Sequence, residues 1–361
     1  MKRMITGMAA ALLAAILFIP VGAVSAEKAI VVDGLTGRVL YEKNSDDRSL
    51  IASTTKIMTA LVVCEQCNVL DRVAIPKEAV GIEGSSIYLM EGEILTVQEL
   101  LYGMMLHSGN DAATALAIYC GGTVEGFAQL MNDKAHRLGL KNTHFVNPHG
   151  LDAPDHYSTA EDLARLANYA MENPLFYRTV SAKNVKIGDR YLRNHNKLLW
   201  QVEGADGVKT GFTKAAGRIL VSSASRQGRR IIAVTINAPN DWNDHKTLIE
   251  EGFSRYCVQT LITYGEHLGA MEVAGGTAGQ VELLAAENFS FAIAEGENWE
   301  IVLPDPGFVY APVASGQMAG YAHISVNGTV VGKVALQYGD TVETEPEIIV
   351  PWWKKLFGGK S

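Results

Sequence analysis

The sequence of 361 residues has only four cysteines, no low-complexity segment and no excess of positive charge. Four cysteines are too few to hold a chain of this length together with disulfides. Because 31 basic residues stand against 39 acidic ones, the basic surface typical of nucleic-acid-binding proteins is not expected. Neither the zinc-binding motif H-E-x-x-H nor the hydrolase motif G-x-S-x-G occurs. The hydrophobic fraction of 48% is that of a globular protein, and the length favours two domains.

Residues 1–26 have the features of a secretory signal peptide. Lys2 and Arg3 precede an uncharged, largely apolar stretch that ends near Val24. Pro20 then breaks the helix, and small residues up to Ala26 provide a cleavage site. The alternative is an uncleaved N-terminal anchor, because the apolar run is nearly long enough to span a bilayer. The protein is therefore expected to act outside the cytoplasm.

Residues 27–264 are predicted to form an α+β domain. A hairpin over residues 28–43 opens this segment, and hydrophobic periodicity then indicates helices. The helices are expected at Ser53–Cys67, Leu95–Leu106, Asp111–Tyr119, Val124–Leu138, Ser158–Met171 and Asp244–Tyr264, and the later strands at Gly207–Thr210, Arg218–Ser223 and Arg230–Asn237. Ser158 and Glu161 fit a capping box. This order indicates an antiparallel sheet that is flanked by helices and closed by both ends of the segment.

The pattern of residue types along the sequence changes near Gly265. From there to residue 349, short strand-like runs alternate with Gly, Asn and Asp turns, which predicts a small all-β domain. Residues 350–361 contain three lysines and three large aromatic residues but no acidic residue. This composition favours an amphipathic tail that lies on a membrane surface, since the segment is too short to span a bilayer. The alternatives are a frayed terminus or a tail packed on the β domain.

Ser53 and Lys56 form an S-x-x-K motif at the start of a predicted helix. A spacing of three residues places both side chains on one helix face, about one turn apart. A serine hydroxyl becomes a good nucleophile when a nearby base takes its proton, and a lysine can be that base if burial lowers its pKa. The helix N-terminus would favour a developing oxyanion. Alone, however, this motif fits an ordinary helix cap beside an exposed lysine.

Two further motifs follow in order. Ser108 and Asn110 belong to a Ser-Gly-Asn turn between two predicted helices, and Lys209, Thr210 and Gly211 form a K-T-G sequence on a predicted strand. Lys209 could face a carboxylate, and glycine lets a substrate backbone approach the strand edge. Each motif alone fits an ordinary turn or strand end. Together they match the ordered set S-x-x-K, S-D-N and K-T-G of serine β-lactamases and penicillin-binding proteins, with Gly109 in place of aspartate.

The chain resembles the D-alanyl-D-alanine carboxypeptidases of the low-molecular-mass penicillin-binding protein type. The resemblance extends from about residue 28 to residue 260, and the β domain and tail match in layout only. Besides the three motifs, it rests on segments 28–61, 85–93, 108–113, 147–152, 156–159, 207–213 and 216–217. It implies a β-lactamase/transpeptidase-like domain followed by a small β domain, with no cofactor and no metal. The implied substrate is a peptidoglycan stem peptide ending in D-Ala-D-Ala, and β-lactams are the implied covalent inhibitors.

The resemblance also implies roles for individual residues. Ser53 would be the acylated nucleophile, Lys56 the general base and Ser108 a proton shuttle to the leaving group. Substrate binding would involve Asn110, Lys209, Thr210, Gly211 and Phe212, and the backbone N–H groups of Ser53 and Phe212 would form the oxyanion hole. His149 is expected to have a structural role or to act indirectly, through a residue that contacts the substrate. Some similar proteins carry an arginine soon after the strand that follows the K-T-G motif, but residues 238–245 contain none.

Two other functions compete with this interpretation. A serine β-lactamase would share the three motifs, but the second domain and the lysine-containing tail argue against it. A catalytically silent wall-binding protein would keep the fold, but all three motifs are intact. Cys64 and Cys67 have C-x-x-C spacing, which fits core or surface thiols, a local disulfide, or metal or redox chemistry. The vegetative or sporulation role, the oligomeric state and the deacylation base stay open.

Overall fold

The computed structural model describes residues 24–303 and 307–346. The predicted signal peptide therefore lies outside the described residues except for its last three positions, and the predicted tail at 350–361 lies outside them entirely. The described chain divides between Cys257 and Val258 into two compact units. Among the described residues, no helix has both the length and the apolar character needed to cross a membrane.

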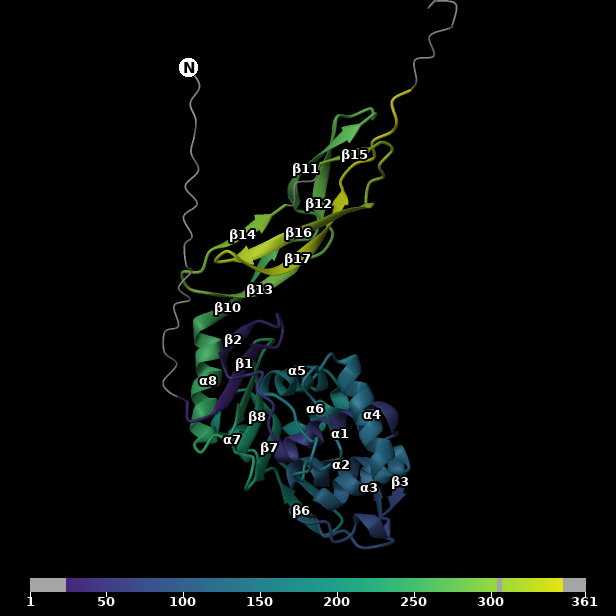
Figure 1. Ribbon diagram of the computed structural model, residues 1–361, viewed down its shortest axis with the longest axis vertical. Helices are drawn as coiled ribbons and strands as arrows, with labels where there is room; N and C mark the ends of the chain where they lie inside the picture. The colour runs from purple at the N-terminus through teal and green to yellow at the C-terminus, as the bar shows by residue number, and fades with distance from the viewer. Residues whose placement is uncertain (1–23, 304–306, 347–361) are drawn as a thin grey trace, which may run out of the picture. The chain divides into compact units, whose positions relative to one another are not determined.

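A five-stranded sheet forms the framework of the first unit (Figure 1). Its strands are β1 (Lys28–Asp33), β2 (Val39–Lys43), β7 (Ala205–Thr213), β8 (Gly217–Arg226) and β9 (Arg229–Ile236). They follow the order β2-β1-β9-β8-β7, and every neighbouring pair is antiparallel. Because β1 pairs with β9 from Lys28 opposite Ile236 to Asp33 opposite Ile231, the two ends of the segment meet in one sheet. The predicted α+β architecture is confirmed, and β7 is an edge strand.

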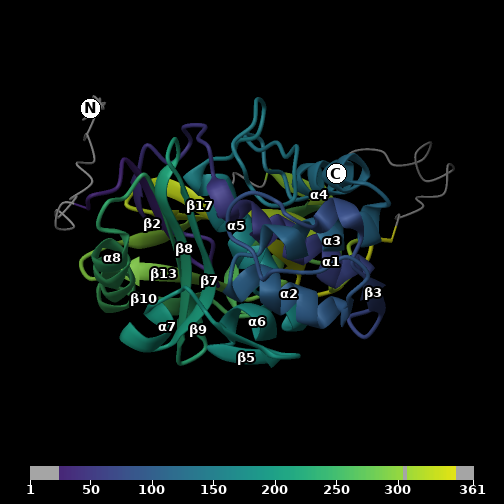
Figure 2. The same ribbon diagram turned by 90° about the horizontal axis from the view of Figure 1, so that it is seen from below.

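Helices cover both faces of this sheet. They are α1 (Lys56–Gln66), α2 (Val97–Leu106), α3 (Asn110–Gly121), α4 (Val124–Arg137), α5 (Ala160–Ala170), α6 (Pro174–Ser181), α7 (Leu198–Gln201) and α8 (Asp241–Arg255). Helix α8 packs on β1, β8 and β9, whereas α5 packs on β1 and β9. Figure 2 shows α8 on one side of β7 and β8, and α1, α2 and α3 on the other side.

Short elements complete the first unit. They are the 3-10 helices η1 (Ala52–Thr55) and η2 (Lys77–Ala79) and the strands β3 (Arg72–Ala74), β4 (Ile94–Thr96), β5 (Asn184–Ile187) and β6 (Arg190–Arg193). β3 pairs with β4, and β5 pairs with β6.

Helix α1 lies at the centre of the main hydrophobic core. Every residue from Lys56 to Cys64 is buried, and the helix contacts α2, α3, α4, α5 and α6. Burial of aliphatic side chains such as Ile57, Leu61 and Val63 on this scale stabilises the domain by roughly 1.5–3 kcal/mol for each side chain. The first residue of the helix is a lysine held in the same core, which fixes the position of its amino group.

Two sequence predictions about helix ends are wrong. The helix expected from Ser158 begins two residues later, at Ala160, because Ser158 forms a β-bridge with Ser49. Thr159 is the N-cap instead, and its hydroxyl accepts a hydrogen bond from the backbone N–H of Asp162 at 3.0 Å. The helix expected to reach Tyr264 ends at Arg255, and strand β10 (Tyr256–Ile262) follows. Tyr, Val, Thr and Ile in this strand favour extended structure, and its last residues enter the core of the second unit.

The second unit is built from strands, as predicted. After β10 come β11 (His267–Ala274), β12 (Gln280–Ala285), β13 (Phe289–Ala294), β14 (Trp299–Val302), β15 (Phe308–Tyr310), β16 (Met318–Val326) and β17 (Thr329–Tyr338). Six of them form a sheet in the order β14-β16-β17-β12-β11-β15, and β10 pairs with β13. Two apolar clusters hold the unit together, one around Leu283 and Leu336 and the other around Ile262 and Val334.

Candidate active site

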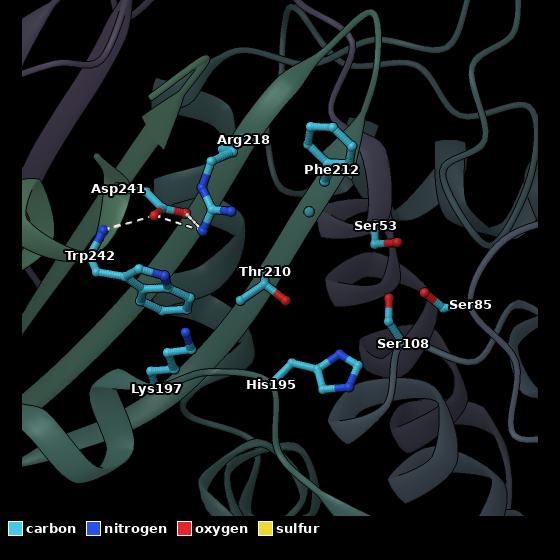
Figure 3. Close-up of a pocket in the computed structure, with 11 residues that line it drawn as sticks. Ser53, Ser85, Ser108, His195, Lys197, Thr210, Phe212, Arg218, Asp241 and Trp242 are labelled. Atoms are coloured by element: carbon cyan, nitrogen blue, oxygen red, sulfur yellow. Dashed lines mark hydrogen bonds and ion pairs between the residues drawn. The ribbon is translucent and has the colours of Figure 1, made fainter. Parts of the chain in front are cut away.

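A cleft of about 390 Å³ opens at the edge strand β7. The three sequence motifs meet there, although they lie far apart in the chain. Ser53, Ser108 and Thr210 line the cleft together with residues that the motifs do not include. Figure 3 shows the hydroxyl groups of Ser53, Ser85 and Ser108 gathered at one end, with Thr210 facing them from β7.

Ser53 and Lys56 are hydrogen-bonded, as their spacing predicts. Ser53 lies in η1, and the Lys56 Nζ atom is 3.0 Å from the Ser53 Oγ atom. The amino group also donates to the Asn110 side-chain oxygen at 2.6 Å and to the backbone oxygen of His149 at 2.7 Å. The Lys56 side chain is fully buried. Three elements far apart in the sequence thus fix one amino group against one hydroxyl.

This arrangement suits a lysine that acts as a base. A neutral amine has two hydrogens and one lone pair, and the two fixed oxygen acceptors take both hydrogens. The lone pair then points at the Ser53 hydroxyl. Burial, together with the nearby charge of Lys209, lowers the pKa of Lys56 well below its ordinary value of 10.5, although the Asp111 carboxylate opposes the shift. Lys56 can therefore lose its proton at a lower pH than an exposed lysine.

Ser108 and Asn110 lie where α2 passes into α3. Ser108 is buried and adopts a positive φ of 63°, which is uncommon for a residue with a side chain. Asn110 is the first residue of α3, and its side-chain nitrogen donates to the backbone oxygen of Glu83 at 2.5 Å. Because the lysine donates to the other side of the same amide, the amide orientation of Asn110 is fixed. Ser108 lines the cleft, whereas Asn110 does not line it and contacts the Lys56 amino group.

The K-T-G motif lies on β7, next to the nucleophile segment. The buried Lys209 amino group donates to the backbone oxygen of Thr210 at 2.9 Å, and burial lowers the pKa of Lys209 to about 7. A Cβ atom at Gly211 would lie 3.3 Å from the Ser53 nitrogen and from the Ile51 oxygen. Glycine thus permits a close approach of β7 to residues 51–53. Phe212 follows with an exposed side chain at the rim of the cleft.

Residues 147–156 contact the segment that carries Ser53 and Lys56. The His149 backbone oxygen binds Lys56, and the ring of His156 contacts the Thr55 hydroxyl at 2.8 Å. Burial lowers the pKa of His149 to about 3 and that of His156 to about 4, so both rings are neutral near pH 7. Because His149 acts on Lys56 through its backbone, the expectation of an indirect role agrees with its position.

The closest approach in this region involves Gly150. Its φ is +88°, and a Cβ atom there would lie only 1.8 Å from the Ala52 oxygen. Gly150→Ala is expected to lower the free energy of unfolding by about 2–5 kcal/mol and to displace Ser53, because it combines strained backbone with a backbone clash. Chemical denaturation measures the first effect, and the rate of Ser53 acylation measures the second.

Gly139→Ala is the matched control for this prediction. Gly139 also has a positive φ of 67°, but nothing lies within 4 Å of a Cβ atom there. It carries the backbone strain alone, so the expected loss is about 1–2 kcal/mol with unchanged acylation. Equal losses from the two variants would show that the contact with Ala52 is unimportant.

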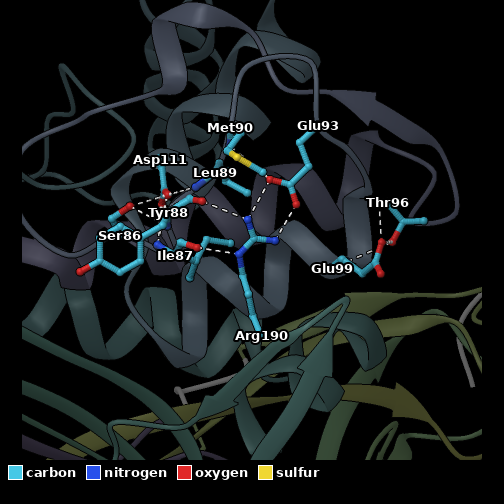
Figure 4. A network of polar contacts seen from close by, with 10 residues as sticks. All are labelled: Ser86, Ile87, Tyr88, Leu89, Met90, Glu93, Thr96, Glu99, Asp111 and Arg190. Carbon is cyan, nitrogen blue, oxygen red and sulfur yellow. Dashed lines mark hydrogen bonds and ion pairs between the residues drawn. The ribbon is translucent and has the colours of Figure 1, made fainter.

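Asp111 and Arg190 hold the segment that borders the cleft at Ser85 (Figure 4). Buried Asp111 accepts hydrogen bonds from the Ser86 hydroxyl at 2.6 Å and from the backbone N–H groups of Ile87 and Leu89. Arg190 donates to the backbone oxygens of Ile87 and Tyr88, and it pairs with Glu93. These contacts fix segment 85–93 from two sides. The resemblance to the family includes this segment, but no motif in the sequence marks Asp111 or Arg190 as its supports.

Several residues that line the cleft were not predicted from the sequence. They are Ser85, His195, Lys197, Arg218, Asp241 and Trp242. Burial lowers the pKa of His195 to about 4, so this ring is neutral near pH 7. Arg218 and Asp241 form an ion pair with two contacts of 2.9 Å. The register of β7 and β8 brings Arg218 to the cleft, and no motif marks it.

The described residues contain no second cluster suited to a metal ion, and two of the cysteines lie on or next to α1. Within residues 24–303 and 307–346, no group of three or more His, Cys, Asp or Glu residues is arranged to hold a metal. Cys64, Cys67 and Cys120 are free thiols. Cys64 is buried in α1, which raises its pKa to about 12, and a hydrogen bond with Cys120 raises the pKa of the Cys67 thiol. Cys64 therefore packs in the core, whereas Cys67 is the C-cap of α1.

Two family models match the chain. Residues 17–240 match the D-alanyl-D-alanine carboxypeptidase family, and residues 256–344 match the C-terminal domain of penicillin-binding protein 5. The chain is 34% identical to D-alanyl-D-alanine carboxypeptidase DacF of Bacillus subtilis (strain 168), over 85% of this chain and 83% of that protein. It is also 34% identical to D-alanyl-D-alanine carboxypeptidase DacC of Escherichia coli (strain K12), over 89% and 85%.

A solved structure shows the same architecture. Penicillin-binding protein 5 of Haemophilus influenzae superimposes with a TM-score of 0.78 at 30% identity, covering 89% of this chain and 98% of that one. The expected fold, a penicillin-binding catalytic domain followed by an all-β domain, is confirmed by these matches. The chain therefore belongs to the D-alanyl-D-alanine carboxypeptidase family and is a serine-type hydrolase of that class.

Proposed function

We propose that this enzyme removes the terminal D-alanine from peptidoglycan stem peptides through an acyl-enzyme on Ser53. The observation that carries the proposal is the contact of 3.0 Å between the Lys56 amino group and the Ser53 hydroxyl. Two further acceptors direct the amine, and burial lowers its pKa. A buried lysine held against a serine in an open cleft suits nucleophilic catalysis.

Acylation follows from this arrangement. Lys56 takes the proton of the Ser53 hydroxyl, and the oxygen attacks the carbonyl carbon of the penultimate D-alanine. The backbone N–H groups of Ser53 and Phe212 stabilise the oxyanion, each by on the order of 3–4 kcal/mol. When the peptide bond breaks, Ser108 passes the proton from Lys56 to the departing D-alanine nitrogen. Water then attacks the carbonyl carbon of the ester, and the bond between this carbon and the Ser53 oxygen breaks. The shortened peptide leaves as a carboxylic acid, and the Ser53 oxygen regains its proton.

The remaining motif residues bind the substrate in this proposal. Asn110 holds the substrate amide while it orients Lys56. Lys209 and Thr210 face the carboxylate side of the cleft, Gly211 keeps β7 close to Ser53, and Phe212 borders the cleft. Penicillin acylates the same serine and leaves slowly, because its ring remains attached to the acyl group.

The proposal extends to the organisation of the whole chain. Residues 1–26 direct export as a signal peptide, and residues 27–257 form the catalytic domain. The β-rich domain begins at Val258, seven residues before the boundary predicted from the sequence, and extends to residue 349. The amphipathic tail at 350–361 attaches the protein to the outer face of the cytoplasmic membrane. Its aromatic residues and lysines support this assignment, since both suit an anionic lipid surface.

A pair of reactions tests the proposed activity. The full-length protein is expected to release one D-alanine from a synthetic pentapeptide ending in D-Ala-D-Ala, measured by quantifying free D-alanine. With benzylpenicillin, it is expected to stay acylated for minutes. Rapid penicillin hydrolysis without D-alanine release would instead indicate a β-lactamase. No reaction with either compound would indicate a catalytically silent protein.

A further inference from the structure

Two cysteines that the proposed mechanism does not use lie together at the ends of two helices. Cys67 is the C-cap of α1, and Cys120 lies in the last turn of α3. Their thiol groups are hydrogen-bonded to each other. The Cys120 sulfur also lies 4.0 Å from the side-chain oxygen of Gln66, the last residue of α1. The pair therefore connects α1 with α3, although the two cysteines are far apart in the sequence.

The same two helices are also joined at their other ends. Helices α1 and α3 contact each other, and Figure 2 shows them side by side. Lys56, the first residue of α1, donates to Asn110, the first residue of α3, at 2.6 Å. Since both helices begin at the active site, the cysteine pair lies about one helix length away from it, roughly 16–18 Å. A covalent bond at the cysteines would hold α1 against α3 without touching the reacting groups.

The surroundings of the pair hold both sulfur atoms in place. Cys67 and Cys120 are half-buried and pack against the main core, whereas Cys64 is buried within it. The Tyr119 hydroxyl donates to Asp71 at 2.7 Å, which links the last turn of α3 to the turn that follows α1. Two thiols in hydrogen-bonding contact need only small side-chain rotations to reach the S–S bond length of about 2.0 Å.

The hydrogen bond makes the two thiols chemically unequal. The Cys67 S–H donates to the Cys120 sulfur, which raises the pKa of Cys67 and lowers the pKa of Cys120, although burial of Cys120 opposes its shift. Cys120 is therefore the thiol that ionises first. A thiolate is the form that attacks a disulfide, so Cys120 is suited to react first and Cys67 to react second.

We infer that Cys67 and Cys120 form a disulfide bond when the protein meets an oxidant of the disulfide class, and that this bond clamps α1 to α3. The Cys120 thiolate attacks one sulfur of the oxidant, forms a mixed disulfide and releases one thiolate. Cys67 then loses its proton and attacks the Cys120 sulfur, which expels the second half of the oxidant as a thiol. In total, the two cysteines give up two electrons and two protons, and the oxidant takes up both. The proposed export places the pair in a compartment where disulfides persist.

Oxidised glutathione tests the inference on the full-length protein. Every sample carries Cys257→Ser, so that this exposed cysteine does not link two chains. After oxidation, denaturation and alkylation, two fewer thiols should be labelled than in the reduced protein. Digestion without reduction should then give one linked peptide pair that contains Cys67 and Cys120. Oxidation should also raise Tm by about 5–15 °C, and dithiothreitol should reverse the rise, since a disulfide across a long loop constrains the unfolded chain.

Two further variants separate this bond from one within the C-x-x-C sequence. On oxidation, Cys120→Ser should form no bond and show no rise in Tm, whereas Cys64→Ala should keep both, each compared with its own reduced form. The reverse result would place the bond between Cys64 and Cys67 and overturn the inference. Unchanged labelling, glutathione adducts alone, or a Cys67–Cys120 bond without a rise in Tm would overturn it as well. None of these measurements uses D-alanine release, so the inference and the proposed function are tested separately.

Discussion

Ser53→Ala is expected to abolish peptide hydrolysis, with kcat/KM reduced on the order of 10⁶-fold, because no other group can form the acyl bond. The variant should remain folded, since Ser53 is only partly buried and, among the described residues, its hydroxyl is hydrogen-bonded only to Lys56. Initial rates of D-alanine release measure the loss, and thermal unfolding measures the stability of the variant.

Ser181→Ala serves as the control, because this serine ends α6 and does not line the cleft. Its rate should match wild type. Residual hydrolysis by Ser53→Ala within about tenfold of wild type would show that another nucleophile performs the reaction.

Lys56→Ala is expected to lower the rate of acylation on the order of 10⁴-fold. General-base catalysis alone accelerates a reaction by about 10²–10⁴-fold. When catalytic groups act as a unit, removing one of them abolishes nearly all of their combined rate enhancement. The reason lies in the geometry, since Lys56 is the amine in contact with the Ser53 hydroxyl at 3.0 Å. Stopped-flow acylation by a chromogenic β-lactam measures the effect.

The pH dependence separates a base from a merely structural lysine. Lys56 must be unprotonated to take the proton of Ser53, so the wild-type rate should fall as the pH falls through the lowered pKa of Lys56. In Lys56→Ala, the slow remaining acylation rate should no longer fall over the pH range in which Lys56 is protonated. Lys134→Ala removes another largely buried lysine, one that contacts Glu65 and Tyr169 instead of the cleft. It should keep the wild-type profile, and an unchanged profile in Lys56→Ala would contradict the assigned role.

Much of the fold is encoded in local patterns. The hairpin at residues 28–43 and the helix over residues 124–137 carry clear alternation, periodicity and turn residues, and both form close to where they are expected. The helix predicted over Asp244–Tyr264 lies at Asp241–Arg255 instead, because helical periodicity hides the strand propensity that begins at Tyr256. Helix α6 and the β5–β6 hairpin were not predicted. Their short apolar patterns become stable only through packing on α2 and β7.

The residues of the candidate site also fall into two groups, those that the sequence predicts and those that it does not. Ser53, Lys56, Ser108 and Asn110 could be predicted because each belongs to a short motif whose order is informative. Arg218 belongs to none, and its place at the cleft depends on the register of β7 against β8. Asp241 and Trp242 depend in addition on where α8 begins, three residues before the predicted start. Residues that a site acquires through pairing between strands leave no signal in a single sequence.

The formation of a covalent bond at Ser53 is the central claim. The intact mass of the full-length protein after brief exposure to benzylpenicillin tests it most directly, followed by digestion to locate the added mass. The account predicts a stable adduct of one penicillin on wild type, carried by the peptide that contains Ser53, and no adduct on Ser53→Ala. An adduct on a different residue, or an equal adduct on Ser53→Ala, would contradict it.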